Sequence, residues 1–112
     1  MRARSQVLLW GAQRASAAML ALCVTVHLIT VIYAVRNGLS AGEILDRTRG
    51  NALWFTFYLI FVAAIAVHAP IGLRAILAES VGWRGRSLDL FVLVVGVLLA
   101  LSGARAAWAV FA

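Results

Sequence analysis

Residues 52–73 read ALWFTFYLIFVAAIAVHAPIGL and carry no formal charge. At a rise of about 1.5 Å per residue, a helix of this length reaches roughly 33 Å, enough to cross the hydrocarbon core of a bilayer. A second uncharged run extends from Ala15 to Val35, and a third run is apolar from Leu90 to Leu101. The sequence therefore predicts an all-α integral membrane protein with three transmembrane helices. We expect the spans at about 15–35, 52–76 and 88–110.

The overall composition also indicates a protein that is surrounded by membrane lipid. The 112 residues are 64% hydrophobic and 12% charged, with a mean hydropathy of +0.99, too apolar for a short chain to bury in a water-soluble core. The net charge of +6 comes from ten arginines against four acids. Arginines without lysines on so apolar a chain suit membrane-flanking positions, so we expect membrane lipid as a partner and no nucleic acid. The single cysteine, Cys23, excludes a disulfide framework within the chain.

The connections between the spans are polar and short. Arg36-Asn37-Gly38 is typical of a helix C-terminus, and residues 41–45 could form a short interfacial helix. The basic connection at residues 80–87 contains two glycines, and Ser87 could cap the third helix. A basic start before an apolar run is also typical of a cleaved signal peptide, but the length of the run favours an anchor. We therefore expect a single membrane domain over residues 1–112.

The orientation follows from the arginines near the helix ends. With the N-terminus in the cytoplasm, six arginines lie on the inner side and four on the outer side. The inner set is Arg2, Arg4, Arg14, Arg74, Arg84 and Arg86, and the outer set is Arg36, Arg47, Arg49 and Arg105. This bias predicts a cytoplasmic N-terminus and an outer C-terminus.

Both histidines of the chain, His27 and His68, fall inside predicted spans. Polar side chains are rare there, usually face the interior of a helix bundle and need a partner. One interpretation of each is an interhelical hydrogen bond through the imidazole, worth less than about 2 kcal/mol. The other is an axial ligand of a b-type haem, the interpretation that we favour for His68.

The expected depths separate the two histidines. If the first helix crosses from Ala15 inside to Val35 outside, His27 lies about 12 Å from the outer edge and His68 about 8 Å from the inner edge. Across a core of about 30 Å the imidazoles are then roughly 10 Å apart in depth, too far to bind one iron easily. Each could instead supply one ligand to one of two haems stacked across the membrane. A proton relay is an alternative, but we expect no aspartate or glutamate in the spans to continue it.

The surroundings of His68 suit a flat macrocycle. At helical spacing its neighbours are apolar or small, namely Phe61, Ala64, Ile65, Ile71, Gly72 and Ala75. Gly72 leaves room for a porphyrin edge or, equally, for close packing of another helix. Arg74 could pair with a haem propionate at the headgroup boundary or reach a lipid phosphate. Pro70 should kink the helix, which can re-aim His68.

Polar residues also mark the inner boundary of the first helix. Ser16 lies eleven residues before His27, nearly on the same face and about 16 Å nearer the cytoplasm. Its hydroxyl could bind a quinone carbonyl or a haem propionate, or it could bond back to its own helix. Arg14 and Gln13 place a cation and an amide at the depth of a quinone head, with anchoring in the headgroups as the alternative.

Two of these segments resemble a known family. The run His68-x-x-x-Gly72-x-Arg74, followed by Glu79, resembles the second-helix signature of the cytochrome b membrane-anchor subunits of succinate dehydrogenase and fumarate reductase. Residues 13–16, Gln-Arg-Ala-Ser, resemble the start of the first helix in that family, commonly His-Arg-x-Ser-Gly. The resemblance implies that His68 is a haem b ligand and that the three helices are half of a haem-binding helical bundle.

The chain also departs from the usual pattern of the family. Gln13 replaces a histidine, Ala17 replaces a glycine, and Trp10 stands where one-haem members carry a serine that helps to bind quinone, which argues against a complete quinone site in this chain. His27-Leu28 instead resembles the first-helix motif of the two-haem members, in which the first two helices each contribute one ligand. The opposing ligands there come from a second set of helices.

The resemblance implies an anchor subunit of the bacterial cytoplasmic (inner) membrane. It would carry electrons between a diffusible quinone and cytoplasmic iron–sulfur and flavoprotein subunits, with two haems b per assembly shared with a second anchor subunit or a second copy of the chain. The implied cofactor-binding residues are His68, His27, Gly72, Arg74, Ser16 and Arg14. The chain has no flavin motif and no cysteine cluster, so the dicarboxylate chemistry would occur in the partners and no catalytic residue is expected here.

Two other functions stay open on the residues alone. A haemless anchor would keep the helices and the quinone, while the histidines would only form hydrogen bonds. A small multidrug transporter has a comparable length, but such proteins normally use four spans and a carboxylate within the membrane.

Overall fold

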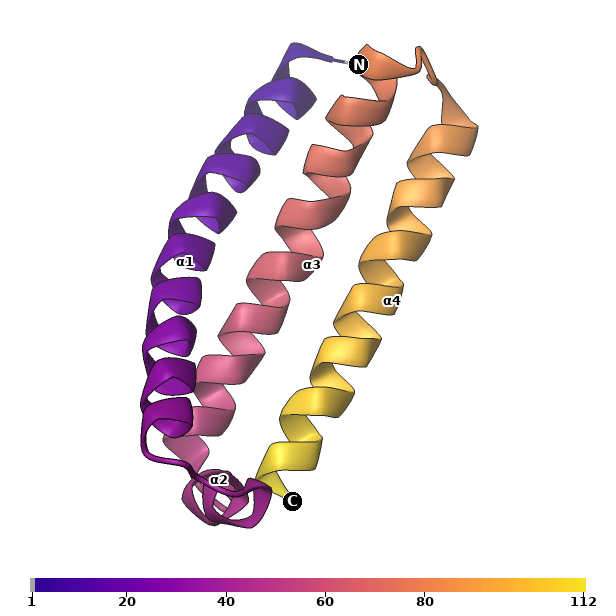
Figure 1. Cartoon of the computed structure of the whole chain (residues 1–112). Coiled ribbons are helices and arrows are strands. Elements are labelled where there is room, and N and C mark those ends of the chain that lie inside the picture. The colour runs from indigo at the N-terminus through magenta and orange to yellow at the C-terminus, as the bar shows by residue number, and fades with distance from the viewer. Residues whose placement is uncertain (1) are drawn as a thin grey trace.

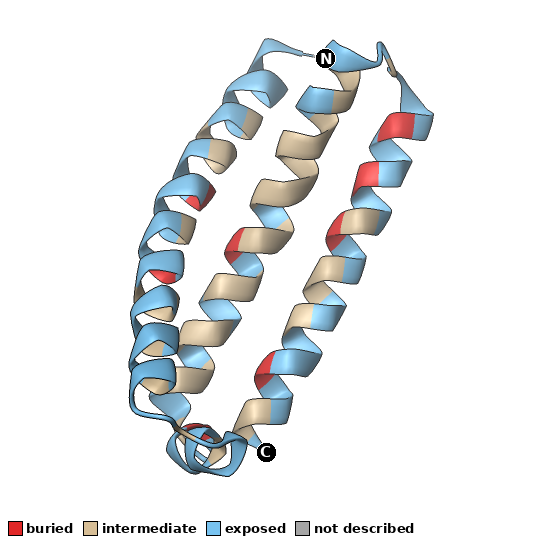
Figure 2. Ribbon diagram, viewed as in Figure 1, coloured by how far each residue is buried: buried red, intermediate tan, exposed pale blue. Residues whose placement is uncertain are grey.

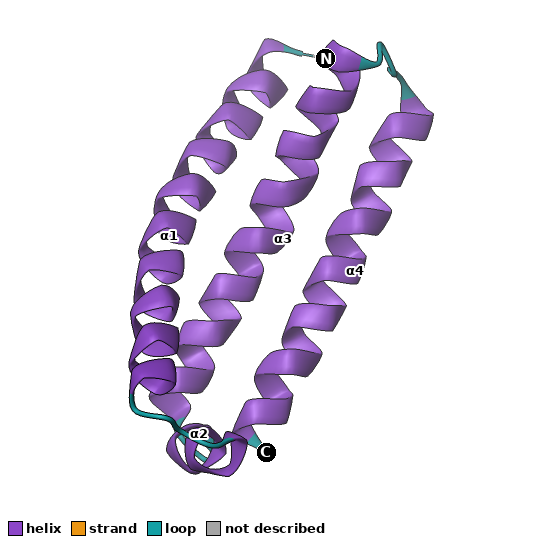
Figure 3. Cartoon of the chain, viewed as in Figure 1, coloured by secondary structure: helices purple, strands orange, loops and turns teal. Residues whose placement is uncertain are grey.

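The computed structural model describes residues 2–112 and contains four helices (Figures 1 and 3). Three are long, namely α1 (Ala3–Arg36), α3 (Ala52–Ser80) and α4 (Arg86–Phe111), and each is long and apolar enough to cross a membrane. The short α2 (Ala41–Thr48) lies across their ends. The described residues form no strand. The predicted all-α class with three spans is confirmed.

The long helices run side by side, and α3 is the helix on which the others pack (Figure 1). The start of α1, the end of α3 and the start of α4 lie at one end of the molecule, which we call the inner end. The outer end holds α2 and the C-terminus. The longest dimension is 49 Å, which exceeds the thickness of a hydrocarbon core of about 30 Å.

Small residues allow α4 to approach α3 closely. The buried residues of α4 lie at helical spacing on one face, at intervals of four residues and then of eleven, namely Leu88, Val92, Gly96 and Ala107. A Cβ added at Gly96 would lie 2.8 Å from Cγ of Pro70. Glycine is therefore needed where α4 passes the proline ring, and such close backbone approach is typical of membrane helix pairs. The helix α3 remains continuous through Pro70.

The outward surfaces of the helices are strongly apolar. The buried residues lie on faces that look toward neighbouring helices, whereas most other positions are exposed (Figure 2). Large apolar side chains are among the exposed ones, for example Leu53 at 79% and Val35 at 74%. Such a surface is suited to lipid or to further helices rather than to water. Cys23 is buried at 2% exposure and packs within the α1–α3 side of the structure, as a small packing residue would.

Local polar residues explain where the helices end. The amides of Gly38 and Leu39 donate to carbonyls of the last turn of α1, and Gly38 has a φ of +62°, which together form the motif that commonly ends helices. The predicted C-terminus at Asn37-Gly38 is thus confirmed. Ser40 caps α2, and the side chain of Asn51 accepts hydrogen bonds from two amides of the first turn of α3. The predicted interfacial helix at 41–45 is present and continues to residue 48.

Two expectations at the start of α4 were wrong. The N-cap is Gly85 and not Ser87, because Ser87 lies inside the helix and accepts a hydrogen bond of 2.8 Å from Nε1 of Trp83. Asp89 lies within the range predicted for the third span, although no carboxylate was expected in the spans. Asp89 belongs to the first turn of α4, at the inner end of the molecule.

Candidate functional site

His68 faces α1, where it meets a buried hydroxyl. The Oγ atom of Ser16 lies 3.4 Å from Nδ1 of His68 and donates a hydrogen bond of 3.1 Å to the carbonyl oxygen of Gln13. Ser16 is buried and His68 is half-buried. Ser16 therefore makes the backbone bond that was one of its expected roles, and it also approaches the imidazole, which the sequence did not predict. The hydroxyl lies too deep between the helices to suit a quinone head.

A groove of about 600 Å³ opens beside this contact at the inner end. Its walls come from all three long helices and include Trp10 and Gln13 of α1, Arg74 of α3 and Arg84 before α4. The side-chain oxygen of Gln13 is buried and has no hydrogen-bond partner among residues 2–112. The groove thus combines apolar walls with nitrogen donors and one amide that still needs a partner.

The amide of Gln13 also occupies the space in front of Gly72. A Cβ added at Gly72 would lie 3.1 Å from Nε2 of Gln13. The absent side chain therefore makes room for a neighbouring helix, which is one of the two interpretations of Gly72 offered by the sequence. Because Gly72 follows His68 by one turn, Gln13, Gly72 and His68 lie along the same contact between α1 and α3.

Arg74 has a partner that sequence reasoning missed. Its Nε lies 2.7 Å from Oδ1 of Asp89, and the two side chains are 32% and 56% exposed. This ion pair joins the end of α3 to the start of α4. The positive charge of Arg74 is therefore partly neutralised within the chain. From the sequence alone we expected only a haem propionate or a lipid phosphate as its partner. The close return of α4 after a tight turn could have suggested the pair.

Arg14 lies apart from the other predicted site residues. It is exposed, its guanidinium lies 5.5 Å from the ring centroid of Trp10, and it does not line the inner groove. Of the two residues expected at the depth of a quinone head, Gln13 lines this groove and Arg14 does not. The pairing with Trp10 at the inner end fits the alternative role of an arginine anchored at the headgroups.

His27 lies nearer the outer end, among aromatic side chains of α3. Its ring meets those of Tyr58 and Phe61 edge-on, with centroid distances of 5.9 and 5.7 Å. Its Nδ1 atom is buried and has no hydrogen-bond partner in the described part of the chain. An imidazole held rigidly by aromatic contacts but short of a polar partner is suited to completing its coordination or hydrogen bonding with another group.

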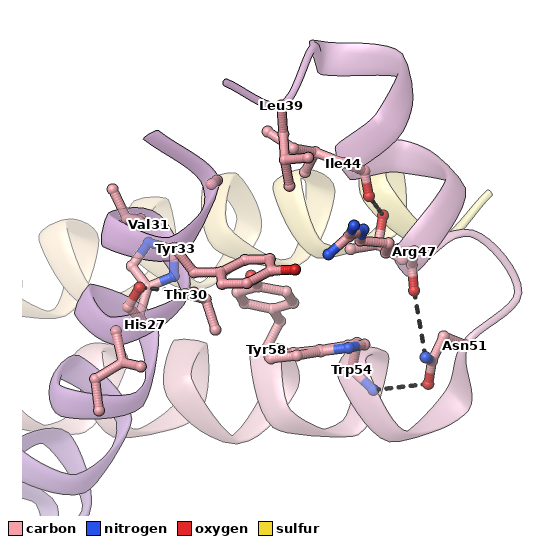
Figure 4. A pocket seen from close by; sticks show the side chains of 13 residues that line it. His27, Thr30, Val31, Tyr33, Leu39, Ile44, Arg47, Asn51, Trp54 and Tyr58 are labelled. Carbon is pink, nitrogen blue, oxygen red and sulfur yellow. Dashed lines mark hydrogen bonds between the residues drawn. The ribbon is translucent and has the colours of Figure 1, made fainter. Parts of the chain in front are cut away.

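A second groove, of about 630 Å³, opens between His27 and the outer end (Figure 4). The rings of Trp54 and Tyr58, which stack at 6.0 Å, lie on its α3 side, and Tyr33 lies on its α1 side. The guanidinium of Arg47 on α2 lies 5.4 Å from the ring centroid of Tyr33. This groove is therefore apolar near His27 and cationic at its outer mouth, a combination suited to an amphipathic anion. Neither Tyr58 nor Arg47 was singled out as a site residue by the sequence.

The two imidazoles lie at different levels of the same α1–α3 pair. Along α1, His27 is eleven residues from Ser16, the contact of His68, which corresponds to about 16 Å at 1.5 Å per residue. Along α3, His68 is seven residues from Phe61, the contact of His27, which corresponds to about 10 Å. The helices therefore keep the imidazoles too far apart for one metal ion.

The donor set can be compared with what a haem requires. Among residues 2–112, no group of three or more His, Cys, Asp or Glu side chains could hold a bare metal ion. A haem brings four nitrogen ligands of its own, so the protein needs to supply only axial ligands. One imidazole at each level, set among apolar and aromatic side chains, fits that requirement as half of a ligand pair.

Comparisons with known proteins give one match. The family model described as succinate dehydrogenase/fumarate reductase transmembrane subunit matches residues 1–104. No curated protein and no solved structure matches the chain significantly. The family match covers all three long helices up to the last turns of α4 and includes both histidines and both grooves.

Proposed function

The chain belongs to the succinate dehydrogenase/fumarate reductase transmembrane-subunit family, and on that premise we propose that it is a haem b-binding anchor with His68 and His27 as ligands. As a member, it is a multi-pass membrane protein with an anchoring role. The observation that carries the haem proposal is the position of the two histidines at two levels inside the α1–α3 pair. Haem b, when bound, accepts and releases one electron.

The residues of the chain have distinct tasks in this proposal. His68 and His27 would each supply one imidazole nitrogen to a haem, and their spacing along the helices sets the distance between the two levels. The aromatic rings of Tyr58 and Phe61 would hold the imidazole of His27 in place through edge-on contacts. Arg47 supplies a positive charge at the outer mouth of the groove.

The inner groove is the part of the chain that could receive the head of a quinone. A quinone presents two carbonyl oxygens, which only accept hydrogen bonds, and the groove offers nitrogen donors from Gln13, Trp10 and Arg84. The apolar remainder of the groove suits a substituted ring. Of the three residues that the sequence offered for binding a quinone, namely Gln13, Arg14 and Ser16, only Gln13 lines this groove.

A partner is required to complete each ligand pair. The chain supplies one imidazole per level, so the second ligand of each haem must come from another anchor subunit or a second copy of this chain. We infer that the inner end, which bears Arg2, Arg4, Arg14, Arg74, Arg84 and Arg86, faces the cytoplasm of a bacterium and the iron–sulfur and flavoprotein subunits. Electrons would then pass between those subunits and quinone.

The proposal is tested by counting haems in the purified intact complex. Two haems per assembly, with His68→Ala and His27→Ala each removing one reduced α-band, are the expected result. The matched controls are Val67→Ala and Leu28→Ala, which change exposed neighbours of each histidine on the lipid side and should leave both bands.

The same measurement separates the remaining alternatives. One haem that survives His27→Ala would refute the outer ligand and leave His68 alone. A complex without any haem would show a haemless anchor, in which the histidines only bond and pack. A small multidrug transporter is not supported, because the chain belongs to another family and the carboxylate of Asp89 is paired with Arg74.

The quinone role of the inner groove has its own test. Gln13→Leu keeps the approximate size of the side chain but removes its hydrogen-bonding groups. We expect a higher KM for quinone with both haem bands retained. An unchanged KM would exclude the groove as the quinone site.

A further inference from the structure

The hydroxyl of Ser16 lies between the backbone of α1 and the imidazole of His68. Its oxygen is 3.1 Å from the carbonyl oxygen of Gln13 and 3.4 Å from Nδ1 of His68. The residue is only 7% exposed, so its hydroxyl is largely closed to water, to a quinone and to a propionate. A chain of polar atoms thus links a helix carbonyl to one specific nitrogen of the ring.

The hydroxyl has one proton and can donate it to only one of these neighbours. The carbonyl of Gln13 can only accept a hydrogen bond, and it is the nearer neighbour. With the proton directed there, the lone pairs of the serine oxygen face His68, and Nδ1 must be the donor in that contact. Because a neutral imidazole carries a single N–H group, Nε2 then keeps its lone pair.

We propose that Ser16 is a positioning residue that selects this tautomer of His68 and so presents Nε2 to the haem iron. The inference rests on the proposed function, because the tautomer matters only if His68 is a ligand. A hydrogen bond donated by the second ring nitrogen orients the ring and makes the ligating nitrogen a stronger donor. A stronger donor stabilises oxidised iron, so Ser16 lowers the midpoint potential of the inner haem.

The outer histidine provides an internal comparison. Nδ1 of His27 is buried but has no hydrogen-bond partner among residues 2–112. No side chain of α1 or α3 in the described residues therefore forms a hydrogen bond with Nδ1 of His27, as Ser16 does with Nδ1 of His68. The effect of changing Ser16 should be confined to the haem that is lost in the His68→Ala variant.

The test is a spectroelectrochemical titration of the intact complex with Ser16→Ala and Ser16→Thr. For Ser16→Ala we expect the inner haem to shift to a more positive midpoint potential and to bind more weakly, by roughly 10-fold or more, as for the loss of other such supporting groups. Ser16→Thr keeps a hydroxyl and should restore both properties. The matched control is Thr25→Ala, which removes an exposed hydroxyl whose hydrogen bond goes to the carbonyl oxygen of Ala21 on its own helix and not to a histidine.

Several outcomes would overturn the inference. An unchanged potential in Ser16→Ala, with a haem that still depends on His68, would refute the role of Ser16 and leave the proposed function intact. A shift to a more negative potential would refute the inference, because it would mean that removing the hydroxyl strengthens His68 as a ligand instead of weakening it. If both haem bands of the complex survive the His68→Ala substitution, the proposed function and this inference are refuted together.

Discussion

Replacing Gly103 with alanine should force α4 away from α3. A Cβ at this position would lie 2.7 Å from both methyl carbons of Val62 and 3.2 Å from its Cβ. Non-bonded carbon atoms prefer about 3.5–4.0 Å, so each methyl would overlap the new atom by roughly 1 Å. Val62 cannot turn aside easily, because valine in a helix strongly prefers one χ1 rotamer. The two helices must therefore separate.

The cost can be worked out from two opposing terms. Overpacking in a tight contact costs about 1–3 kcal/mol, and a clash with two methyls of a stiff side chain belongs near about 3 kcal/mol. Alanine recovers about 0.8–1 kcal/mol of helix propensity, so the free energy of unfolding should fall by about 2 kcal/mol. Gly11 has no atom within 4 Å of an added Cβ, so Gly11→Ala should instead stabilise α1 by up to about 1 kcal/mol.

The two substitutions should thus differ by about 3 kcal/mol, or more than about 100-fold in the unfolding equilibrium. The assay is unfolding of the purified chain in mixed micelles with increasing sodium dodecyl sulfate, followed by circular dichroism. Val62→Ala removes both clashing methyls and leaves only the Cβ contact of 3.2 Å, so Gly103→Ala should cost much less in that background. If the cost of Gly103→Ala is the same with and without Val62→Ala, the steric explanation is wrong.

Three smaller predictions concern the ends of the helices. A double-mutant cycle of Arg74→Gln with Asp89→Asn should give a coupling free energy of about 0.2–1 kcal/mol, because the 2.7 Å ion pair is partly exposed. The coupling should weaken as salt is added, and a coupling that does not depend on salt would contradict the prediction. Asn51→Ala should cost about 1 kcal/mol and speed hydrogen exchange in the first turn of α3, whereas Asn51→Asp should retain the cap. Gly38→Ala should cost about 1–2 kcal/mol at its φ of +62° and fray the end of α1, and unchanged exchange there would argue against the cap.

The motif formed by His68, Gly72 and Arg74 predicted the family to which the chain belongs. The motif did not specify which contacts these residues make in the folded chain. Gly72 faces the amide of Gln13, and Arg74 pairs with Asp89. Neither contact follows from the motif, because both partners come from other helices. The ligand roles of His68 and His27 stay predictions until haem is measured in the complex.

The sequence by itself determined the three spans, their approximate ends and the two levels of the histidines. These features depend on hydropathy, helical rise and local caps such as Asn37-Gly38. All three are set by residues that are close together along the chain. Only the tertiary structure decided that Ser16 meets His68 and that Arg74 meets Asp89. Those contacts depend on how antiparallel helices are rotated and shifted relative to one another. Small residues such as Gly96 and Gly103 set this arrangement through close packing, and the sequence of one helix alone does not specify it.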